Sequence, residues 1–534
     1  NSFCTLLVAC GSVMSLPSVA VASRDANGVV ATLHKSSDVT ADTPEGVEIL
    51  LRSASILVAH AVSECTHGAG HLVVRHGGAV ENTRLAQGYF AEIDGAELTP
   101  EVLQCIETSV KASVESAAPI DTRTVPHRYL RRLLERQNCH KSVALLDSLN
   151  QVSYECHVFG EWHCLAHDHV VTPDSTLCGL GDKLELLFDD RHGSTGFWIR
   201  FRFLEAPAYV EGLTKRLRQD IAMTRTIDVV DDATANPTHW VEAEERRFTT
   251  QVNECAEAIH RRGDATKLVL ISGPSASGKT TFSHRLSLAL RALGRIPTVL
   301  SIDDYYRDAS EETYPKQANG QPNHEVVECL RLDQFAADMK ALFAGETVET
   351  PIFDMRVSKP KPQGRTTTLP SNGILIMEGI FALSPKLTSQ LDAASMVRIF
   401  IVPLPRTSID ELTFVSNQTI REVRRIVRDF RGRGRDASAS ILRGPTVRAG
   451  EEQSIFPNMR HADIVFNSTM GHELAVLHPH CMTLLRSVKP NDAAHGHAQR
   501  LANLLSALAS VSEAGVPPES LLREFIGGGG FDGE

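Results

Sequence analysis

The segment LISGPSASGKTTFSHRL, residues 270–286, constrains the fold more than any other part of the chain. It contains the pattern G-x-x-x-x-G-K-[ST], which begins at Gly273 and ends at Thr280. An apolar run over residues 268–271 precedes the pattern, and large apolar side chains follow it at helical spacing until Gly294. The sequence therefore predicts a buried strand of a parallel sheet, a glycine-rich loop and a helix that ends at Gly294.

A loop of this kind is suited to bind the phosphates of a nucleotide. Its glycines allow backbone N–H groups to converge on phosphate oxygens, and the helix N-terminus adds about half a positive charge. Lys279 is expected to reach the outer phosphates and Thr280 to place its hydroxyl on Mg²⁺. The expected nucleotide-binding residues of the loop are Gly273, Ser275, Ser277, Gly278, Lys279, Thr280 and Thr281.

Length and composition limit the class of protein. A chain of 534 residues exceeds what one hydrophobic core usually serves, so several domains are expected. The net charge of −11 argues against a surface built as a whole to bind nucleic acid. The 11 cysteines form no C-x-x-C pair, which together with a nucleotide site predicts a reduced, cytoplasmic protein without disulfides. No apolar run reaches the ~18 residues that span a bilayer, so no membrane partner is expected.

Changes in pattern divide the chain into five segments. The opening is interpreted as a truncated start rather than a secretory signal, because it lacks a basic region and Pro17 interrupts its apolar run. Strand and helix patterns alternate in the fourth segment, which predicts an α/β domain with a parallel sheet covered by helices. The segments are a remnant of a small β-rich domain (1–42), an α+β domain (43–203), a helical linker (204–263), a P-loop domain (264–485) and a helical tail (486–534).

Acidic residues end two further predicted strands. Asp303 and Asp304 follow an apolar strand, and Glu378 ends another in GILIMEG. Ligands of open α/β sheets gather at the carboxyl ends of the strands, so one of the aspartates could act as a base or a Mg²⁺ partner, and Glu378 could hold Mg²⁺ through water. The alternatives are a turn or capping acid for the aspartates and an N-cap acid for Glu378.

The segment REVRRIVRDFRGRGR, residues 421–435, carries seven arginines against two acids. Arg421, Arg425 and Arg428 share one face of a predicted helix, and the glycines beyond it allow a hinge. Such a segment suits a lid that closes over a triphosphate. The alternative is a solvated basic face or an RNA-contacting patch.

Together these motifs resemble the uridine kinase and phosphoribulokinase family of P-loop kinases. The resemblance rests on SIDDYY (301–306), ILIMEGIFAL (374–383) and RRIVRDFRGRGR (424–435). It implies ATP and Mg²⁺ as cofactors, with Mg²⁺ held by Thr280 and Glu378. It also implies the following roles: Asp303, Lys279 and Arg428 as catalytic residues, Arg433 and Arg435 on the nucleotide, and Tyr306, Phe353 and Arg425 on the substrate.

Departures from the family's pattern leave the acceptor open. In PIFDMRVSK, Phe353 and Met355 take the aromatic places of uridine kinases, and Ser358 or Lys359 stands where a histidine is expected. An acid that grips the ribose hydroxyls is replaced near Asn323. Phosphate chemistry is therefore expected, whereas uridine itself is not specified.

The segments VRAGEEQSIFPNMRHADIVFNS and PPESLLREFIGG resemble a subgroup that carries a threonyl-tRNA-synthetase-like N-terminal region. Residues 43–203 accordingly look like the editing domain of threonyl- and alanyl-tRNA synthetases, with Arg52 and Ile56 in place of its H-x-x-x-H ligands. His163 and His167 could share a helical face and, with Cys156, Cys164 and His169 nearby, bind Zn²⁺. Buried thiols and surface imidazoles are the favoured interpretation, so an editing-like shape without editing chemistry is expected.

The sequence thus predicts an ATP-dependent kinase that acts on a hydroxyl of a nucleoside or related small molecule. Two alternatives remain. One is a sugar-phosphate kinase like phosphoribulokinase, and the other is a nucleotide-regulated RNA-binding module without turnover. Homo-oligomerisation and RNA contact through the N-terminal domain stay open.

Overall fold

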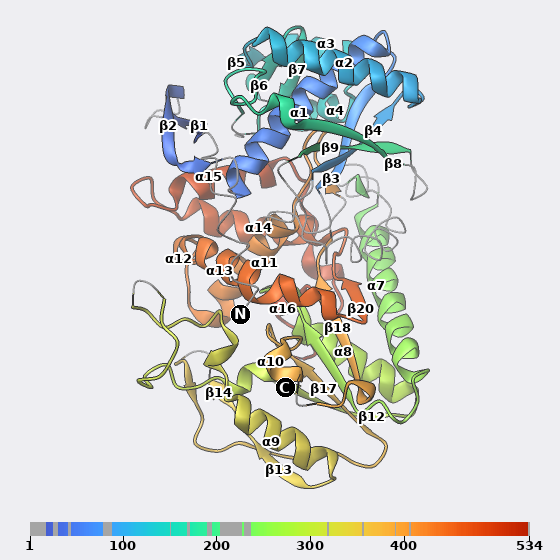
Figure 1. Cartoon of the computed structure of the whole chain (residues 1–534), viewed down its shortest axis with the longest axis vertical. Coiled ribbons are helices and arrows are strands. Elements are labelled where there is room, and N and C mark those ends of the chain that lie inside the picture. The colour runs from blue at the N-terminus through green and yellow to red at the C-terminus, as the bar shows by residue number, and fades with distance from the viewer. Residues whose placement is uncertain are drawn as a thin grey trace, which may run out of the picture. The chain divides into compact units, whose positions relative to one another are not determined.

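The computed structural model describes most of the chain (Figure 1) and divides it into two compact units. Unit 1 comprises Asn1–Ala206 and Asp410–Thr413, and unit 2 comprises Pro207–Ile409 and Phe414–Glu534. The described residues are 18–24, 30–40, 44–77, 88–149, 151–167, 171–189, 195–202, 227–228, 236–317, 320–354, 357–389, 391–404 and 407–531.

Unit 1 combines antiparallel sheets with helices, which is the α+β composition predicted for residues 43–203. One sheet has the strand order β3-β4-β9-β8, a second has the order β5-β6-β7, and β1 and β2 form a separate hairpin. The strands are β1 (Ser18–Arg24), β2 (Val30–Thr40), β3 (His71–Gly77), β4 (Tyr89–Asp94), β5 (Asp121–Pro126), β6 (Ser153–Phe159), β7 (Trp162–Leu165), β8 (Leu184–Asp189) and β9 (Gly196–Phe201). The helices are α1 (Pro44–Cys65), α2 (Pro100–Ser116), α3 (His127–Arg136) and α4 (His140–Leu149).

Helix α1 is the core helix of unit 1. Its segment Gly46–Cys65 is the one described helix that is long and apolar enough to cross a membrane, but 78% of its most apolar window is buried inside the protein. Leu50, Leu57 and Val62 are among its fully buried side chains. Burial of this extent accounts for the apolar composition of the helix by packing.

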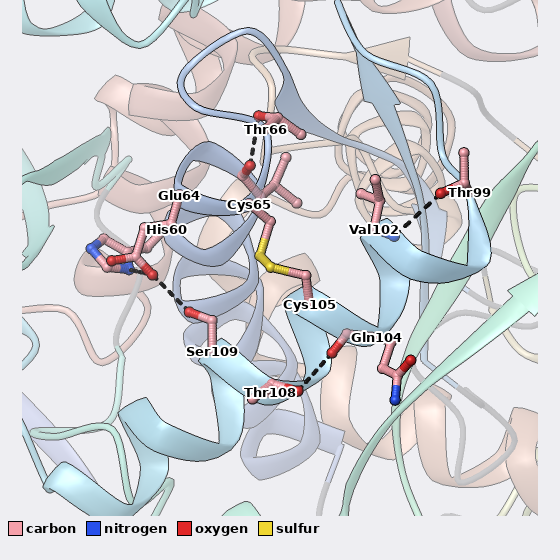
Figure 2. Close-up of a disulfide and its surroundings, with 11 residues drawn as sticks. His60, Glu64, Cys65, Thr66, Thr99, Val102, Gln104, Cys105, Thr108 and Ser109 are labelled. Atoms are coloured by element: carbon pink, nitrogen blue, oxygen red, sulfur yellow. Dashed lines mark hydrogen bonds and ion pairs between the residues drawn. A yellow bond between two sulfur atoms is a disulfide. The ribbon is translucent and has the colours of Figure 1, made fainter.

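A disulfide joins α1 to α2, so the prediction of a chain without disulfides is wrong. Cys65 is the last residue of α1 and Cys105 lies in the second turn of α2, with their Cα atoms 6.0 Å apart (Figure 2). Ser109 of α2 also donates a hydrogen bond to Glu64 of α1. Two cysteines 40 residues apart become neighbours only through the packing of these helices, which cysteine spacing does not reveal. The cysteines therefore do not support the prediction of a reduced compartment.

The cysteine and histidine segment of unit 1 is not helical. Trp162–Leu165 form strand β7, and His167 has a backbone φ of 46°, so His163 and His167 do not share a helical face. His169 lies outside the described residues. Within the part of the chain that the structure describes, no group of three or more His, Cys, Asp or Glu side chains is arranged to hold a metal ion. Cys156 and Cys164 are buried, as the favoured interpretation expects. The His167 side chain is not a surface imidazole, because it is only 9% exposed and lies 2.6 Å from the buried carboxylate of Asp410.

Unit 2 is an α/β domain around a five-stranded parallel sheet with the order β12-β17-β11-β18-β20. The predicted parallel sheet is confirmed. The three predicted strands are β12, β17 and β11, which lie next to one another in this order from one edge of the sheet to its centre. The sheet strands are β11 (Leu268–Ser272), β12 (Ile296–Ser301), β17 (Gly373–Glu378), β18 (Met396–Val402) and β20 (Ile464–Asn467). Shorter strands are β10 (Ile227–Asp228), β13 (Thr347–Thr350), β14 (Phe353–Asp354), β15 (Lys359–Pro360), β16 (Arg365–Thr368) and β19 (Thr407–Ser408).

Helices surround this sheet, and α7 and α8 pack against each other on it. Phe248 of α7 and Phe282 of α8 both contact Phe466 of β20, with ring centroids 5.4 and 4.3 Å away. The helices are α7 (Pro237–His260), α8 (Lys279–Ala292), α9 (Leu332–Phe343), α10 (Pro385–Thr388), α11 (Asn417–Arg433), α12 (Ala437–Leu442), α13 (Gly444–Gly450), α14 (Glu473–Arg486), α15 (His495–Ser506) and α16 (Arg523–Ile526). The predicted end of α8 is confirmed, since Gly294 has a φ of 85°.

Candidate active site

The glycine-rich loop joins β11 to α8, as predicted. Ala276 and Gly278 have φ values of 59° and 89°, which turn the chain from the strand into the helix. A Cβ atom at Gly273 would lie 2.1 Å from the backbone oxygen of Ile401, so only glycine fits between this loop and β18. Gly278 at the N-cap of α8 provides no capping side chain, so the first N–H groups of the helix point toward the place where an anion could bind.

Lys279 is folded back over its own loop. Its Nζ atom donates hydrogen bonds to the backbone oxygens of Gly273 and Pro274, each at 3.1 Å. Burial lowers the pKa of Lys279, while the carboxylates of Glu378 and Asp303 oppose this change. The ammonium group therefore lies where phosphate oxygens could replace the two carbonyl contacts.

Thr280 and Glu378 meet beside the loop. The Thr280 hydroxyl lies 3.5 Å from Glu378 Oε1, and Ser301 donates a hydrogen bond of 3.1 Å to the same oxygen. Burial and the neighbouring Asp303 raise the pKa of Glu378 to about 7. A hydroxyl and a carboxylate are hard oxygen ligands, and Mg²⁺ in nucleotide sites usually needs only one or two carboxylates besides the phosphates.

The two aspartates after β12 point into different surroundings. They lie in a short 3-10 helix, Ile302–Tyr305, whose Asp303 N–H is capped by Ser301. The Oδ1 atom of Asp303 is buried without a hydrogen-bond partner, and burial raises the pKa of this carboxyl group. Asp304 instead accepts a hydrogen bond of 3.0 Å from the backbone N–H of Phe353, so it serves as the turn acid that was one alternative.

Asp429 organises the arginines at the end of α11. Arg428 donates to its Oδ1 at 2.8 Å, and Arg433 and Arg435 lie 3.8 and 3.7 Å from its carboxylate. Burial tends to raise the pKa of Asp429, but the surrounding guanidinium groups outweigh it and the pKa is lowered. Arg428 and burial together lower the pKa of Arg433 to about 10. Three cations are thus held close together although they repel one another.

The first turns of α11 are buried, which excludes a solvated basic face for this part of the helix. Arg421 forms an ion pair with the buried Glu451. Arg424, which is fully buried, donates to Glu473 and to the backbone oxygen of Ala276 in the glycine-rich loop. These side chains therefore support the loop from inside the protein.

Aromatic and titratable side chains form another part of the site. The rings of Tyr306 and Phe353 lie 5.4 Å apart, and the Tyr306 hydroxyl donates to the backbone oxygen of His324. Burial and the neighbouring Glu451 raise the pKa of Glu325 to about 7. Ser358, one of the two residues that could stand in the place of the family's histidine, lines the cavity. Met355, which takes one of the aromatic places, lies outside the described residues.

Most of these side chains surround one cavity of about 340 Å³ in unit 2, whereas Asp304, Arg421 and Arg424 do not line it. The predicted site residues that line it are Ser275, Lys279, Thr280, Asp303, Tyr306, Phe353, Glu378, Arg425, Arg428, Arg433 and Arg435. Gly273, Ser277, Gly278 and Thr281 belong to the loop and the start of α8 without lining the cavity. Sequence reasoning gave no role to five of the residues that line it, namely His324, Glu325, Arg443, Glu451 and Glu524. Glu451 and Glu524 lie in segments quoted for the resemblance, but no local pattern marks them.

Comparison with known proteins finds kinases that are similar to part of unit 2. Residues 268–475 match the model of the Phosphoribulokinase / Uridine kinase family. The chain is 30% identical over 253 residues to mouse uridine-cytidine kinase-like 1, and this match covers 46% of this chain and 42% of the mouse protein. It is 29% identical over 213 residues to uridine kinase of Staphylococcus epidermidis, covering 40% of this chain and 92% of that kinase. For uridine kinase of Halobacterium salinarum the identity is 28% over 197 residues, with 36% and 77% covered.

Residues 268–475 are thus similar to the P-loop kinases of this family, and the matches support an ATP-dependent kinase. The chain spans less than half the length of the mouse relative. The family match begins at β11, so it does not include residues 1–206 of unit 1.

Proposed function

We propose that this protein transfers the γ-phosphoryl group of ATP to a hydroxyl of a nucleoside or a related small molecule. The observation that carries the proposal is the shared cavity, which is lined by Lys279, by Asp303 with its unpartnered Oδ1 atom, and by the arginines around Asp429. Phosphoryl transfer depends mainly on positioning the reactants and neutralising the charge of the transferred group. This set of side chains is suited to both tasks.

In this proposal Lys279 and the N–H groups of the loop bind the triphosphate. Thr280 and Glu378 would hold Mg²⁺, which when bound neutralises charge on the phosphate oxygens. The fit of these residues to the ion rests on their adjacent oxygen atoms and on the orphaned Oδ1 atom of Asp303 nearby. Asp303 accepts the proton of the acceptor hydroxyl, and its raised pKa makes it a stronger base than an exposed aspartate.

The acceptor in this proposal lies between the aromatic pair and the arginines. Tyr306 and Phe353 offer ring faces to a flat base, and Arg425 and Glu325 offer hydrogen bonds to hydroxyl groups. The uridine kinases among the relatives support a nucleoside. A sugar phosphate is the second candidate, because Arg443 adds a further cation to this part of the cavity.

We further propose that unit 1 has the shape of a tRNA-synthetase editing domain without its chemistry. The support is its α+β composition together with the residues in the ligand positions. Arg52 forms an ion pair with Glu48, and Ile56 is 1% exposed. Neither side chain can bind a metal ion.

A phosphate-transfer screen tests the kinase proposal. Purified protein is incubated with ATP, Mg²⁺ and a panel of nucleosides and sugar phosphates, and acceptor-dependent release of ADP is measured. The Lys279→Ala variant should remain folded but lose transfer, because no other loop residue supplies a mobile cation to the outer phosphates. Parental turnover in folded Lys279→Ala protein would remove this site from the reaction, and a salt-dependent shift of tRNA without any ADP release would favour an RNA-binding module.

A further inference from the structure

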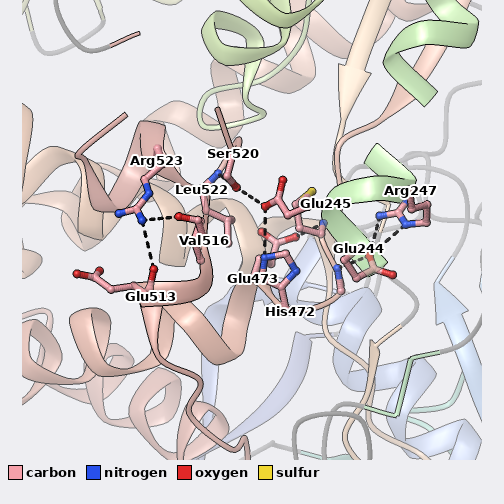
Figure 3. A network of polar contacts seen from close by, with 12 residues as sticks. Glu244, Glu245, Arg247, His472, Glu473, Glu513, Val516, Ser520, Leu522 and Arg523 are labelled. Carbon is pink, nitrogen blue, oxygen red and sulfur yellow. Dashed lines mark hydrogen bonds and ion pairs between the residues drawn. The ribbon is translucent and has the colours of Figure 1, made fainter. Parts of the chain in front are cut away.

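The C-terminal segment Val516–Gly527 packs into unit 2 although it lies beyond residues 268–475. Ser520 and Leu522 are completely buried, and Phe525 is 1% exposed. Ser520 donates a hydrogen bond to the buried Glu245 of α7, and Arg523 donates to the backbone oxygens of Glu513 and Val516 (Figure 3). This segment, called the tail below, is therefore a fixed part of the domain.

The tail supports the glycine-rich loop directly. A Cβ atom at Gly278 would lie 2.4 Å from the Leu521 side chain, so Leu521 fills the space that this glycine leaves. The guanidinium carbon of Arg424 lies over the ring of Phe525, 5.2 Å from the ring centre. Arg424 in turn donates a hydrogen bond to the backbone oxygen of Ala276. Two loop positions thus depend on tail side chains.

Glu524, a residue of α16, contacts the first turn of α8 and lines the cavity. Its Oε2 atom accepts hydrogen bonds from the hydroxyl and the backbone N–H of Thr281, at 3.1 and 3.4 Å. Because α8 begins at Lys279, this N–H belongs to the first turn, whose free donors bind phosphate in such loops. A carboxylate and a phosphate oxygen cannot use the same two donors at once.

We propose that the tail is part of the nucleotide site and that Glu524 sets its affinity by competing with phosphate for Thr281. The inference rests on the proposed function, because it takes a nucleotide as the ligand of the cavity. The backbone near Glu524 is fixed by the buried side chains on either side of it. The phosphate therefore gains the two donors of Thr281 only when the Glu524 side chain rotates away from them. This rotation also separates the negative charge of Glu524 from that of the phosphate.

Equilibrium binding without an acceptor tests this inference. ATP, inorganic triphosphate and adenosine are titrated into the full chain and into Glu524→Gln by calorimetry, with EDTA present to exclude magnesium effects. Glu524→Gln should bind ATP and inorganic triphosphate about tenfold or more tightly, because a neutral amide holds the two donors of Thr281 less strongly than a carboxylate does. Adenosine, which has no phosphate, should bind equally well to both proteins.

Glu519→Gln is the matched control, because it removes the same charge from an exposed position of the same tail. It should leave all three affinities unchanged, and thermal melting should show that both variants are folded. Equal or weaker triphosphate binding by Glu524→Gln overturns the inference and makes Glu524 a supporting contact. Lys279→Ala separates the two proposals: if it weakens ATP binding while Glu524→Gln has no effect, the nucleotide site stands and the inference fails. If Lys279→Ala leaves ATP binding unchanged, the proposed function fails.

Discussion

At the residue scale, the neighbouring side chains of Asp303 and Asp304 differ in their hydrogen bonding. Asp303 has a buried oxygen without a partner, whereas Asp304 is bonded to the backbone of Phe353. We predict that Asp303→Asn lowers turnover by roughly 10²–10⁴-fold, the usual effect of removing a general base, with nearly unchanged ATP affinity. Turnover and nucleotide affinity should be measured with the acceptor that the screen identifies.

Asp304→Asn is the matched control for this prediction. The amide oxygen of asparagine can still accept the N–H of Phe353, so the change should be milder. A larger loss of turnover for Asp304→Asn would move the base by one residue. Unchanged turnover in both variants would remove the acid–base role from this pair.

Glu325 should make the stability of the protein depend on pH. Burial and Glu451 raise its pKa from 4.5 to about 7, so folding favours the protonated form. The contribution of Glu325 to stability is therefore complete below pH 4.5 and is lost as the pH rises to about 7, by on the order of 3 kcal/mol. Chemical unfolding at pH 5 and pH 8 should show that Glu325→Gln gains stability relative to the parent at the higher pH.

Glu328→Gln provides the comparison, because it removes the same charge three residues away. The hydrogen bond from Lys386 lowers the pKa of Glu328, so this variant should gain no stability over the same pH range. An equal gain in both variants would indicate a general effect of charge rather than of burial at Glu325.

The site residues that could be predicted from the sequence are those that belong to a local sequence motif. Lys279 and Thr280 have fixed places in a loop motif, and Glu378 ends a strand whose neighbours share its edge of the sheet. Glu451 and Glu524 could not be found in this way. Glu451 reaches the loop from 176 residues away in sequence and Glu524 reaches Thr281 from 243 residues away. Only the tertiary fold brings their carboxylates to the site.

At the element scale, helices α1 and α2 are joined by the Cys65–Cys105 disulfide. A bridge across 40 residues restricts the unfolded chain, and bonds of this kind typically contribute about 2–4 kcal/mol. We predict that the free energy of unfolding of Cys65→Ser/Cys105→Ser protein is lower by this amount, so that it unfolds at a lower denaturant concentration. Mass spectrometry of the non-reduced parental protein should detect the linked peptides.

Reduction serves as the control for the double variant. A reducing agent should lower the stability of the parent and leave that of the double variant unchanged. A parental protein that contains two free thiols at these positions, or a double variant as stable as the oxidised parent, would contradict the prediction.

Helix α11 illustrates what charge patterning predicts and what it misses. Seven arginines in fifteen residues suggested a lid over the nucleotide, and Arg425, Arg428, Arg433 and Arg435 do line the cavity. Burial of Arg421 and Arg424 could not be predicted, because their partners Glu451 and Glu473 lie 30 and 49 residues further on. A count of charges does not show which of them will meet an opposite charge inside the fold.

At the scale of the whole molecule, the two units were predicted unequally. The order of strands and helices in unit 2 follows from alternating patterns that each form locally, so its α/β class and central strands were correct. The assignment of Asp410–Thr413 to unit 1 was not foreseen. In that unit the Glu411 carboxylate accepts hydrogen bonds from the backbone N–H groups of Lys141 and Ser142 at the start of α4. Four residues carry no periodic pattern, so only their contacts identify where they belong.

Unit 1 gives the last prediction, which concerns the chain as a whole: it should not hydrolyse aminoacyl-tRNA. On α1, Arg52 is paired with Glu48 and Ile56 is buried in the core, so this helix presents no metal ligands at those positions. Deacylation of mischarged tRNA should stay at the background rate with Zn²⁺ or with EDTA, in the parental protein and in Lys279→Ala alike. A rate above background that EDTA abolishes would show that other residues of unit 1 bind a catalytic metal. A rate that needs ATP and is lost in Lys279→Ala would instead assign the hydrolysis to the nucleotide site of unit 2.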